Sequence, residues 1–411
     1  MDHRIYDKYY CFSKSKNQII GNINLRILGK GKTALSIKEV YKDAILYDDG
    51  DLEKFDKESE ELTVVSPGIP PHNHLVKSTK NLVSEYDLFR DNMPFSIWIS
   101  GTNGKTTTTQ MLQHLLKDKE SQCGGNIGFP IATLDVKKKI WILETSSFTL
   151  HYTNVAKPNI YVLLPVSDDH LSWHGTFEEY EKAKLKPLSL MTKHDIAIIP
   201  LKFKSYQTDA KVIYYHSTDD LAQYFKIDVN KIKFKEPFLM DAVIALGVAT
   251  VSTNEEIDYN KLNTFIQDPH KLEEFLDSKQ RIWVDDSKAT NVDATIQAIK
   301  TYKDKKIYLI LGGDDKGANL NPLFEELQKY EIELFFIGKN RELLLELSSK
   351  YNVNGKICIY LDEAVEEINL RFKSQEDAVS ILSPAAASLD QFSSYKERGE
   401  KFKEFVNFLK N

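Results

Sequence analysis

The sequence predicts an α/β protein with mostly parallel strands, and three observations support this class. Short apolar runs recur along the whole chain, and amphipathic stretches long enough for a helix separate them. Several of these runs end in glycine or acidic residues, which is typical of strands that present polar groups at the carboxyl edge of a parallel sheet. The length of 411 residues is enough for roughly two to four domains, each with its own core.

The first block of this pattern covers residues 1–92 and begins with a strand followed by a glycine-rich turn. The Gly-x-Gly-x-x-Ala spacing at 29–34, with Asp48 downstream, is close to a dinucleotide-binding fingerprint, so an NAD-linked site stays open at this point. Ser-Pro-Gly-Ile at 66–69 marks a turn-rich loop near the end of the block. The strands expected here are 23–28, 44–49 and 62–65.

The second block, residues 93–267, opens with the most informative motif of the chain. An apolar run is followed by Gly-Thr-Asn-Gly-Lys-Thr-Thr at 101–107 and then by a helix-like segment. This order of strand, glycine loop and helix is the context that a phosphate-binding P-loop requires. Lys105 would neutralise the outer phosphates, and the Thr106 hydroxyl would ligate Mg²⁺. The alternative is a strand-turn-helix junction whose lysine binds no phosphate.

Further polar residues of this block follow predicted strands or glycine turns. Glu144 ends an apolar run, where an α/β sheet presents ligands, although it could instead cap a helix. Asp-Asp-His at 168–170 follows the next run and could also be an ordinary loop. Asn126 lies among glycines that allow close approach of a ligand, whereas Lys184 cannot be distinguished from a solvated helix face. The strands expected here are 95–99, 140–143, 160–164, 196–199 and 212–215, with a helix at 239–250.

Three apolar runs of the third block, residues 268–411, end in polar loops. The loops span 285–291, 312–317 and 383–392, and they combine small residues with charged or hydroxyl residues. In a parallel sheet such loops meet at one edge and form a ligand crevice, although ordinary turns could give the same pattern. The strands expected here are 281–284, 307–311, 334–337 and 379–382.

The composition argues against several classes of function. The formal net charge is −6, and no basic stripe with interleaved aromatic residues is present, so we expect no nucleic-acid partner. Cys11, Cys123 and Cys358 are scattered and should be free thiols in a reducing compartment. No run of about 18 apolar residues occurs, and the segment after Met1 is polar, which predicts a cytoplasmic protein without a membrane anchor.

Segments spread over the whole chain form a recognisable set. They are Ser-Pro-Gly-Ile at 66–69, Gly-Thr-Asn-Gly-Lys-Thr-Thr at 101–107, Gly-Asn-Ile-Gly at 125–128, Leu-Glu-Thr-Ser-Ser-Phe at 143–148, Asp-Asp-His at 168–170, Asp-Ser-Lys-Ala-Thr-Asn at 286–291, Leu-Gly-Gly-Asp-Asp-Lys at 311–316 and Ser-Pro-Ala-Ala-Ala-Ser-Leu-Asp-Gln-Phe at 383–392. Together they resemble the Mur ligases, the ATP-dependent amino-acid ligases of peptidoglycan precursor synthesis. The motifs at 286–291 and 383–392 are most similar to those of the branch that adds D-glutamate.

The resemblance implies a fold and a reaction. It implies an N-terminal Rossmann-like domain at 1–92 for UDP, a central P-loop ATPase domain at 93–267, and a C-terminal Rossmann-like domain at 268–411 for the amino acid. The implied enzyme is a cytoplasmic monomer that uses ATP and two Mg²⁺ ions to join D-glutamate to UDP-N-acetylmuramoyl-L-alanine through an acyl phosphate. The turn at 29–34 would then hold the UDP diphosphate instead of NAD.

The same resemblance assigns roles to individual residues. Lys105, His170 and Lys184 would be catalytic, with Lys184 carbamylated so that an oxygen anion replaces its ammonium as a metal ligand. The nucleotide would contact Gly101, Thr102, Asn103, Gly104, Lys105, Thr106, Thr107, Lys271, Asp286 and Lys288. The metal would contact Thr106, Glu144, His170 and Lys184. The UDP substrate would contact Lys32, Thr33, Asp48, Gly68, Asn126 and Ser146, and D-glutamate would contact Thr290, Lys316, Ser388, Leu389 and Tyr395.

The chain also departs from the family pattern. Pro-Phe-Leu-Met-Asp at 237–241 stands where the family usually has His-Asn-x-x-Asn near the adenine. Lys271 replaces an arginine and cannot form the bidentate phosphate contact, and Tyr395 replaces a phenylalanine. Residues 1–22 have no counterpart. Two other classes stay open: a related ligase that uses another amino acid or a folate, and a P-loop ATPase that hydrolyses ATP without either substrate.

Overall fold

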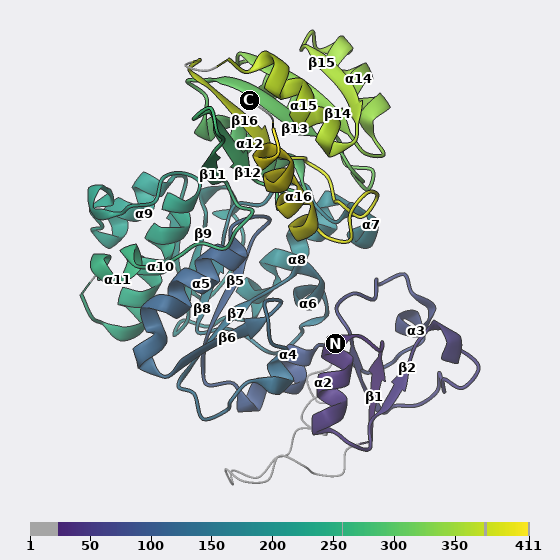
Figure 1. Cartoon of the computed structure of the whole chain (residues 1–411). Coiled ribbons are helices and arrows are strands. Elements are labelled where there is room, and N and C mark those ends of the chain that lie inside the picture. Colours follow the sequence, from purple (N-terminus) through teal and green to yellow (C-terminus); the bar gives the residue numbers. More distant parts are fainter. Residues whose placement is uncertain (1–23, 257, 374–375, 410–411) are drawn as a thin grey trace. The chain divides into compact units, whose positions relative to one another are not determined.

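The structure, a computed structural model, describes residues 24–256, 258–373 and 376–409. It contains three β-sheets accompanied by helices, which confirms the predicted α/β class (Figure 1). Contacts divide the chain into two compact units. The first runs to Val166 and resumes with Trp173–Phe265, and the second combines Ser167–Ser172 with the chain from Ile266 onward. Two sheets belong to the first unit and one to the second, and the predicted domain boundaries at 92 and 267 stay a prediction.

The first sheet is parallel and has the strand order β2-β1-β3-β4. The Arg26 side chain of β1 is buried in this sheet. Its guanidinium donates hydrogen bonds to Thr63 Oγ1 (3.0 Å) and to the carbonyl of Asp56 (2.6 Å). The strands are β1 (Leu25–Leu28), β2 (Ile45–Tyr47), β3 (Leu62–Val65) and β4 (Leu82–Val83). The helices are α2 (Lys32–Val40), α3 (His74–Lys77) and α4 (Glu85–Leu88).

The second sheet is parallel, with the order β10-β9-β8-β5-β7-β6, and both of its faces are covered. Ile97 and Ile99 of β5 pack in the core that contains residues of α5 and α10, whereas Trp98 packs in the core that contains residues of α8. Burial on both faces explains why these strands read as continuous apolar runs. The strands are β5 (Phe95–Ser100), β6 (Ser121–Gly125), β7 (Ile140–Glu144), β8 (Ile160–Leu163), β9 (Ile196–Pro200) and β10 (Lys211–Tyr215). The helices are α5 (Lys105–Leu116), α6 (Ser147–Tyr152), α7 (Leu171–His174), α8 (Phe177–Leu190), α9 (Thr218–Phe225), α10 (Phe238–Thr253) and α11 (Tyr259–Asn263).

The third sheet has the order β11-β12-β16-β13-β14-β15, and β11 is its antiparallel exception. Its two faces are also buried, one in a core with α12, α13 and α14 and the other in a core with α15 and α16. The strands are β11 (Glu273–Leu276), β12 (Ile282–Asp285), β13 (Lys306–Leu311), β14 (Ile332–Ile337), β15 (Gly355–Ile359) and β16 (Ala378–Leu382). The helices are α12 (Val292–Thr301), α13 (Asn321–Leu327), α14 (Arg341–Lys350), α15 (Leu361–Arg371) and α16 (Tyr395–Asn407).

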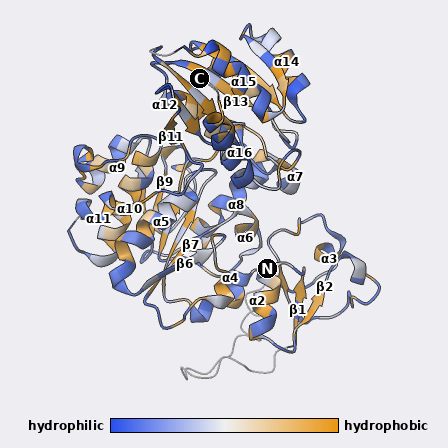
Figure 2. Cartoon of the chain, in the orientation of Figure 1, coloured by the Kyte–Doolittle hydropathy of each residue, from blue (hydrophilic) through white to orange (hydrophobic). Residues whose placement is uncertain are grey.

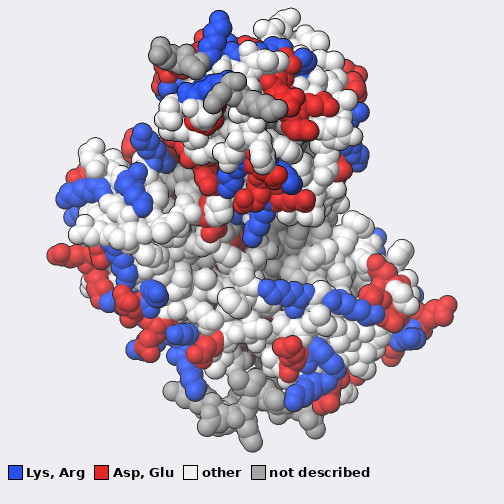
Figure 3. Space-filling model, in the orientation of Figure 1, with Lys and Arg blue, Asp and Glu red and all other residues white. Residues whose placement is uncertain are grey.

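Apolar residues concentrate in the strands, and polar residues alternate with apolar ones on the surrounding helices (Figure 2). The face drawn in Figure 3 mixes positive and negative side chains and has no broad patch of one sign. Among the described helices, none combines the length and apolar character needed to cross a bilayer. Cys123 and Cys358 are free thiols, as predicted, and burial raises the pKa of both; Cys11 lies outside the described residues.

Candidate active site

The glycine loop between β5 and α5 has the backbone of a phosphate-binding turn. Gly101 and Gly104 have φ values of 144° and 81°, which residues with a side chain rarely adopt. A Cβ at Gly101 would lie 2.5 Å from the Cβ of Leu164, and one at Gly104 would lie 2.6 Å from an Asp241 carboxylate oxygen. Both glycines are therefore required by conformation and by the closeness of their neighbours.

Lys105 lies over this loop. Its ammonium donates to the carbonyls of Gly101 (3.0 Å) and Thr102 (2.7 Å). The helix that follows has no acidic residue in its first turn, and no side chain caps its first N–H groups. The positive end of the helix dipole and the lysine charge thus favour an anion at the same place.

Oxygen donors suited to Mg²⁺ lie beside the loop. The hydroxyl of Thr106 donates to Glu144 Oε2 at 2.8 Å, and Asn126 Nδ2 donates to Glu144 Oε1 at 2.7 Å. Glu144 ends β7, and its side chain is buried although it carries a carboxylate. Carboxylate and hydroxyl oxygens are hard ligands that fit Mg²⁺. The structure therefore brings Asn126, predicted to contact the UDP substrate, together with Thr106 and Glu144, which were predicted to hold the metal.

Lys184 of α8 lies under the same loop and is 1% exposed. Its Nζ donates to the Gly101 carbonyl (2.7 Å) and to Ser100 Oγ (3.4 Å), and it lies over the Tyr180 ring, 4.7 Å from its centroid. An ammonium group has no lone pair to offer a metal, so Lys184 fits a metal site only after carbamylation. Tyr180, which sequence analysis did not single out, also bonds Thr102 through its hydroxyl (2.9 Å).

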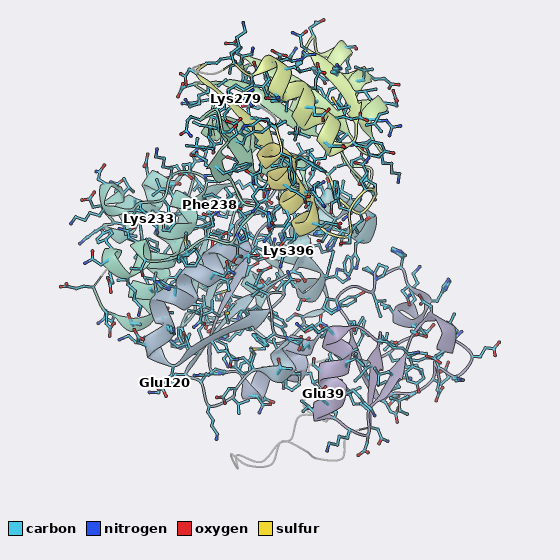
Figure 4. The ribbon with its side chains drawn as sticks, in the orientation of Figure 1. Glu39, Glu120, Lys233, Phe238, Lys279 and Lys396 are labelled. Atoms are coloured by element: carbon cyan, nitrogen blue, oxygen red, sulfur yellow. The ribbon has the colours of Figure 1, made fainter. Side chains whose placement is uncertain are left out.

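The start of α10 occupies the position where the sequence departs from its family. Asp241 is buried and accepts a hydrogen bond from Thr108 Oγ1 at 2.7 Å, so its carboxylate is tied to α5. Phe238, in the first turn of α10, offers an aromatic ring where the family usually has an amide (Figure 4). An aromatic face and a carboxylate can contact a base by stacking and by accepting from an exocyclic amine. Their contact with adenine stays a prediction.

A pocket of about 220 Å³ lies in the first unit between the first and second sheets. It brings together three residues predicted to contact the UDP substrate, namely Lys32, Thr33 and Asn126. Lys32 Nζ donates to the Gly128 carbonyl across this pocket. The complete lining consists of Lys32, Thr33, Pro67, Glu85, Tyr86, Gly125, Asn126, Gly128, Pro130 and Thr149. Ser146, also predicted, caps α6 by accepting from the N–H of Thr149 at 3.1 Å.

The turn after β1 needs only one of its two glycines. Gly29 has φ of 103°, and a Cβ there would lie 2.7 Å from Ser66 Oγ, whereas Gly31 has open space around it. Asp48 pairs with Lys30 at 2.7 Å, so this lysine belongs with the residues predicted at the UDP diphosphate. The sequence contained a signal for Lys30, since it lies between the two glycines. Gly68 is exposed in the neighbouring loop.

Glu85 is a buried carboxyl in the pocket wall that sequence analysis missed. Its Oε1 accepts the N–H of Ala132 at 3.0 Å. Burial raises the pKa of Glu85 from its ordinary value of 4.5 to about 7, and backbone hydrogen bonds from Ala132 and Ile131 oppose that rise. Glu85 thus holds the segment that closes one side of the pocket.

The second unit contains the three predicted polar loops at the carboxyl ends of β12, β13 and β16. Asp286 accepts hydrogen bonds from Ser383 Oγ (2.7 Å) and from the N–H of Leu272 (3.2 Å). Burial raises the pKa of Asp286 to about 8. Lys288 Nζ lies 5.9 Å from the centroid of the Tyr395 ring. The structure therefore brings Asp286, Lys288 and Tyr395 into one group.

The other residues predicted to bind D-glutamate lie on the same loops. Ser388 is buried, whereas Thr290, Lys316 and Leu389 are exposed. Lys316 has φ of 53°, which places it in a tight turn stabilised by the Asp314 and Asp315 side chains. A small polar ligand could reach Thr290, Lys316 and Leu389 from solvent, whereas the Ser388 side chain is covered.

The linker before β11 carries Lys271 and a buried His270. Lys271 pairs with Asp268 at 3.2 Å, a contact that leaves its nucleotide role a prediction. His270 Nδ1 bonds Asp285 at 2.6 Å, and with Glu273 these two could form a metal-binding group. Lys403 Nζ already lies 3.3 Å from Glu273 and 3.9 Å from Asp285, so an ammonium supplies the positive charge there.

His170 belongs to the Ser167–Ser172 segment of the second unit. It has φ of 54°, and its Nε2 lies 3.4 Å from an Asp169 carboxylate oxygen. Its side chain is 45% exposed, and a neighbouring carboxylate of this kind orients an imidazole. Its catalytic and metal-binding roles stay predictions.

The fold and the site together define a class of protein: an enzyme that binds a nucleoside triphosphate at a P-loop. The sequence pattern of the Mur ligase middle domain matches residues 99–240, which include the P-loop, Glu144 and Lys184. The UDP-N-acetylmuramoylalanine–D-glutamate ligase of Campylobacter jejuni strain RM1221 is 47% identical over 94% of this chain and all of its own length. That of Helicobacter pylori strain J99 is 46% identical over 93% of this chain and 99% of its own. The chain therefore belongs to the UDP-N-acetylmuramoylalanine–D-glutamate ligase family of the Mur ligases.

A solved structure supports the fold independently. The MurF ligase of Thermotoga maritima in complex with ADP matches with a TM-score of 0.58 at 16% identity, over 94% of this chain and 95% of that one. This likeness confirms the architecture of the Mur ligases for this chain. The chain is an ATP-dependent, amide-forming ligase by its family membership.

Replacing Glu85 by glutamine should remove a pH-dependent part of the stability. The pKa of Glu85 is about 7 in the folded chain and 4.5 in the unfolded chain, so the folded chain binds the proton more tightly. The stabilisation from this proton is therefore fully present below pH 4.5 and is lost as the pH rises through 7. We expect the free energy of unfolding of the wild type to fall by about 3 kcal/mol relative to Glu85→Gln across this range. Urea unfolding at several pH values measures this difference, and a difference independent of pH would contradict the assignment.

Proposed function

We propose that this protein joins D-glutamate to UDP-N-acetylmuramoyl-L-alanine in the cytoplasm, as a monomer, in peptidoglycan precursor synthesis. The observation that carries the proposal is the arrangement at one edge of the second sheet, where Lys105 contacts the glycine loop and Thr106 of the same motif contacts Glu144. The relatives named for this activity match both units of the chain, which supports the assignment of both substrates.

The first step activates a carboxylate, because a carboxylate is a poor electrophile. The terminal alanine carboxylate of the UDP substrate attacks the γ-phosphorus of ATP, the bond to the β-phosphate oxygen breaks, and ADP leaves. Lys105 stabilises the charge on the transferring group from the loop that it covers. Thr106 and Glu144 would hold Mg²⁺, which neutralises the phosphate oxygens when it is bound.

Lys184 supports this step if its amine reacts with carbon dioxide. The ammonium first loses one proton to give the amine, the amine nitrogen bonds the carbon of carbon dioxide, and loss of a second proton leaves an anionic carbamate with two oxygen ligands. Its burial against the P-loop suits a residue that would offer carbamate oxygens to a Mg²⁺ ion bound beside this loop. The carbamate nitrogen keeps one N–H, which can still donate to the Gly101 carbonyl.

The second step forms the amide bond. The amine of D-glutamate attacks the acyl carbon, the C–O bond to phosphate breaks, and inorganic phosphate leaves with the electron pair while the amine loses a proton. Thr290, Lys316 and Ser388 hold D-glutamate, with Leu389 and Tyr395 beside them. The pocket around Lys32, Thr33 and Asn126 holds the UDP sugar. Asp48, Gly68 and Ser146 are the further contacts that we assign to this substrate.

The decisive test is phosphate release with each substrate omitted in turn. We expect release only when ATP, Mg²⁺, UDP-N-acetylmuramoyl-L-alanine and D-glutamate are all present, with a product heavier by one glutamyl residue in mass spectrometry. Release with another amino acid or a folate would favour a related ligase instead. Release that needs neither acceptor nor amino acid would favour a simple ATPase and contradict the proposal.

Lys105→Ala should lower kcat on the order of 10²-fold or more, because it removes a main electrostatic stabiliser of the transferring phosphoryl group. Steady-state phosphate release measures the change. Lys119→Ala is the matched control, since that lysine lies in the short turn that follows the carboxyl end of α5 and pairs with Glu255. Turnover near that of the wild type in Lys105→Ala would show that the loop does not act on phosphate.

Lys184→Ala should abolish most turnover, and a short exogenous carboxylic acid should partly restore it by supplying the missing oxygen ligands. The same acid should not restore Lys105→Ala, whose lost group is a cation. Phosphate release with and without the acid measures the rescue. Full activity of Lys184→Ala in the absence of acid would exclude the carbamate.

A further inference from the structure

The first turns of α16 carry an arginine that joins two of the polar loops of the third sheet. Arg398 is 1% exposed, and its Nε donates to Ser287 Oγ at 2.9 Å. Its Nη2 donates to the carbonyls of Ser287 (2.8 Å) and Ala386 (3.1 Å). Lys396, labelled in Figure 4, marks this end of the helix. One guanidinium therefore bridges the loop after β12 and the loop after β16.

Further contacts close this arrangement. Ser287 Oγ donates to the carbonyl of Tyr395 at 2.8 Å, which fixes the same loop to the start of α16. The loop after β13 is attached as well, because Asp314 and Ala387 exchange two backbone hydrogen bonds of 2.9 Å. The three polar loops thus form one connected block, with Arg398 at its base.

The choice of arginine at this buried position is informative. Burial lowers the pKa of the Arg398 guanidinium to about 10, while Asp390, Asp285 and Asp286 act in the opposite direction, so the group stays charged at neutral pH. Burying a charge is costly, and an apolar side chain of similar size would fill the space with less penalty. The guanidinium distributes its N–H donors over a planar fork and contacts both loops, whereas a lysine carries its three donors on a single nitrogen.

We propose that Arg398 is a positioning residue for D-glutamate. It sets the distance between the loop that carries Lys288 and Thr290 and the loop that carries Ser388. The inference rests on the proposed function, in which these loops hold the amino acid. It assigns Arg398 no contact with substrate; its effect passes through Ser287 and Ala386.

The test compares substrate dependences in Arg398→Met, Arg398→Lys and Ser287→Ala. We expect Arg398→Met to raise KM for D-glutamate by about tenfold or more, because small misplacements of binding groups are costly. KM for UDP-N-acetylmuramoyl-L-alanine, whose predicted contacts lie in the first unit, should stay within about twofold of the wild type. Arg398→Lys and Ser287→Ala should give smaller increases in KM for D-glutamate, since each retains part of the bridge.

Arg371→Met is the matched control, because Arg371 ends α15 and forms exposed ion pairs with Glu333 and Glu367. Its two KM values should equal those of the wild type. Circular dichroism and thermal melting verify that each variant is folded. If Arg398→Met does not fold, the Ser287→Ala comparison decides, since that change removes one hydroxyl and leaves the guanidinium in place.

Two results would overturn the inference. One is an unchanged KM for D-glutamate in the folded variants, and the other is an equal rise in both KM values, which would indicate general damage. A wild-type enzyme without D-glutamate-dependent phosphate release would overturn the proposed function and this inference with it. If the wild type does release phosphate in the presence of D-glutamate, an unchanged KM for D-glutamate or an equal rise in both KM values would overturn only the role of Arg398, and the proposed function would stand.

Discussion

The P-loop site depends on the register of the parallel strands β5, β7 and β6. This register determines where the carboxyl ends of the three strands lie relative to one another. Ile99 pairs with Glu144, and Gly125 pairs with the same residue from the other side. The loops that leave these strands therefore begin at one level, so Glu144 meets Thr106 and Asn126. A shift of one residue in this register would turn the carboxylate to the opposite face of the sheet.

Buried ionisable side chains fix several of the loops near the predicted binding sites. Glu85 accepts the N–H of Ala132, and Asp87 accepts the N–H groups of residues 154, 155 and 156. Arg398 provides the opposite charge and donates to loop carbonyls. Irregular backbone that is buried must satisfy its polar groups, and a charged side chain can satisfy two or three of them at once. The chain thus obtains defined loop positions without regular secondary structure.

The sequence predicts the strands at the centre of each sheet and misses many at the edges. Every predicted strand is present, while the described strands that were not predicted are β4, β6, β11 and β15, and all four are edge strands. Central strands are buried on both faces and stand out as apolar runs, whereas β6 is Ser-Gln-Cys-Gly-Gly. Local motifs identified Lys105, Glu144 and the three polar loops. Tyr180 and Arg398 were missed because their contacts join segments far apart in the sequence.

The position of Lys105 over its own loop has a consequence for ligand affinity. Its ammonium already contacts two loop carbonyls, so the side chain and the loop are ordered during folding and not on encounter with a nucleotide. The entropy lost by immobilising this long side chain therefore lowers the free energy of unfolding and does not weaken nucleotide binding. An incoming triphosphate must compete with those carbonyls for the lysine, but it meets a receptor that is already shaped.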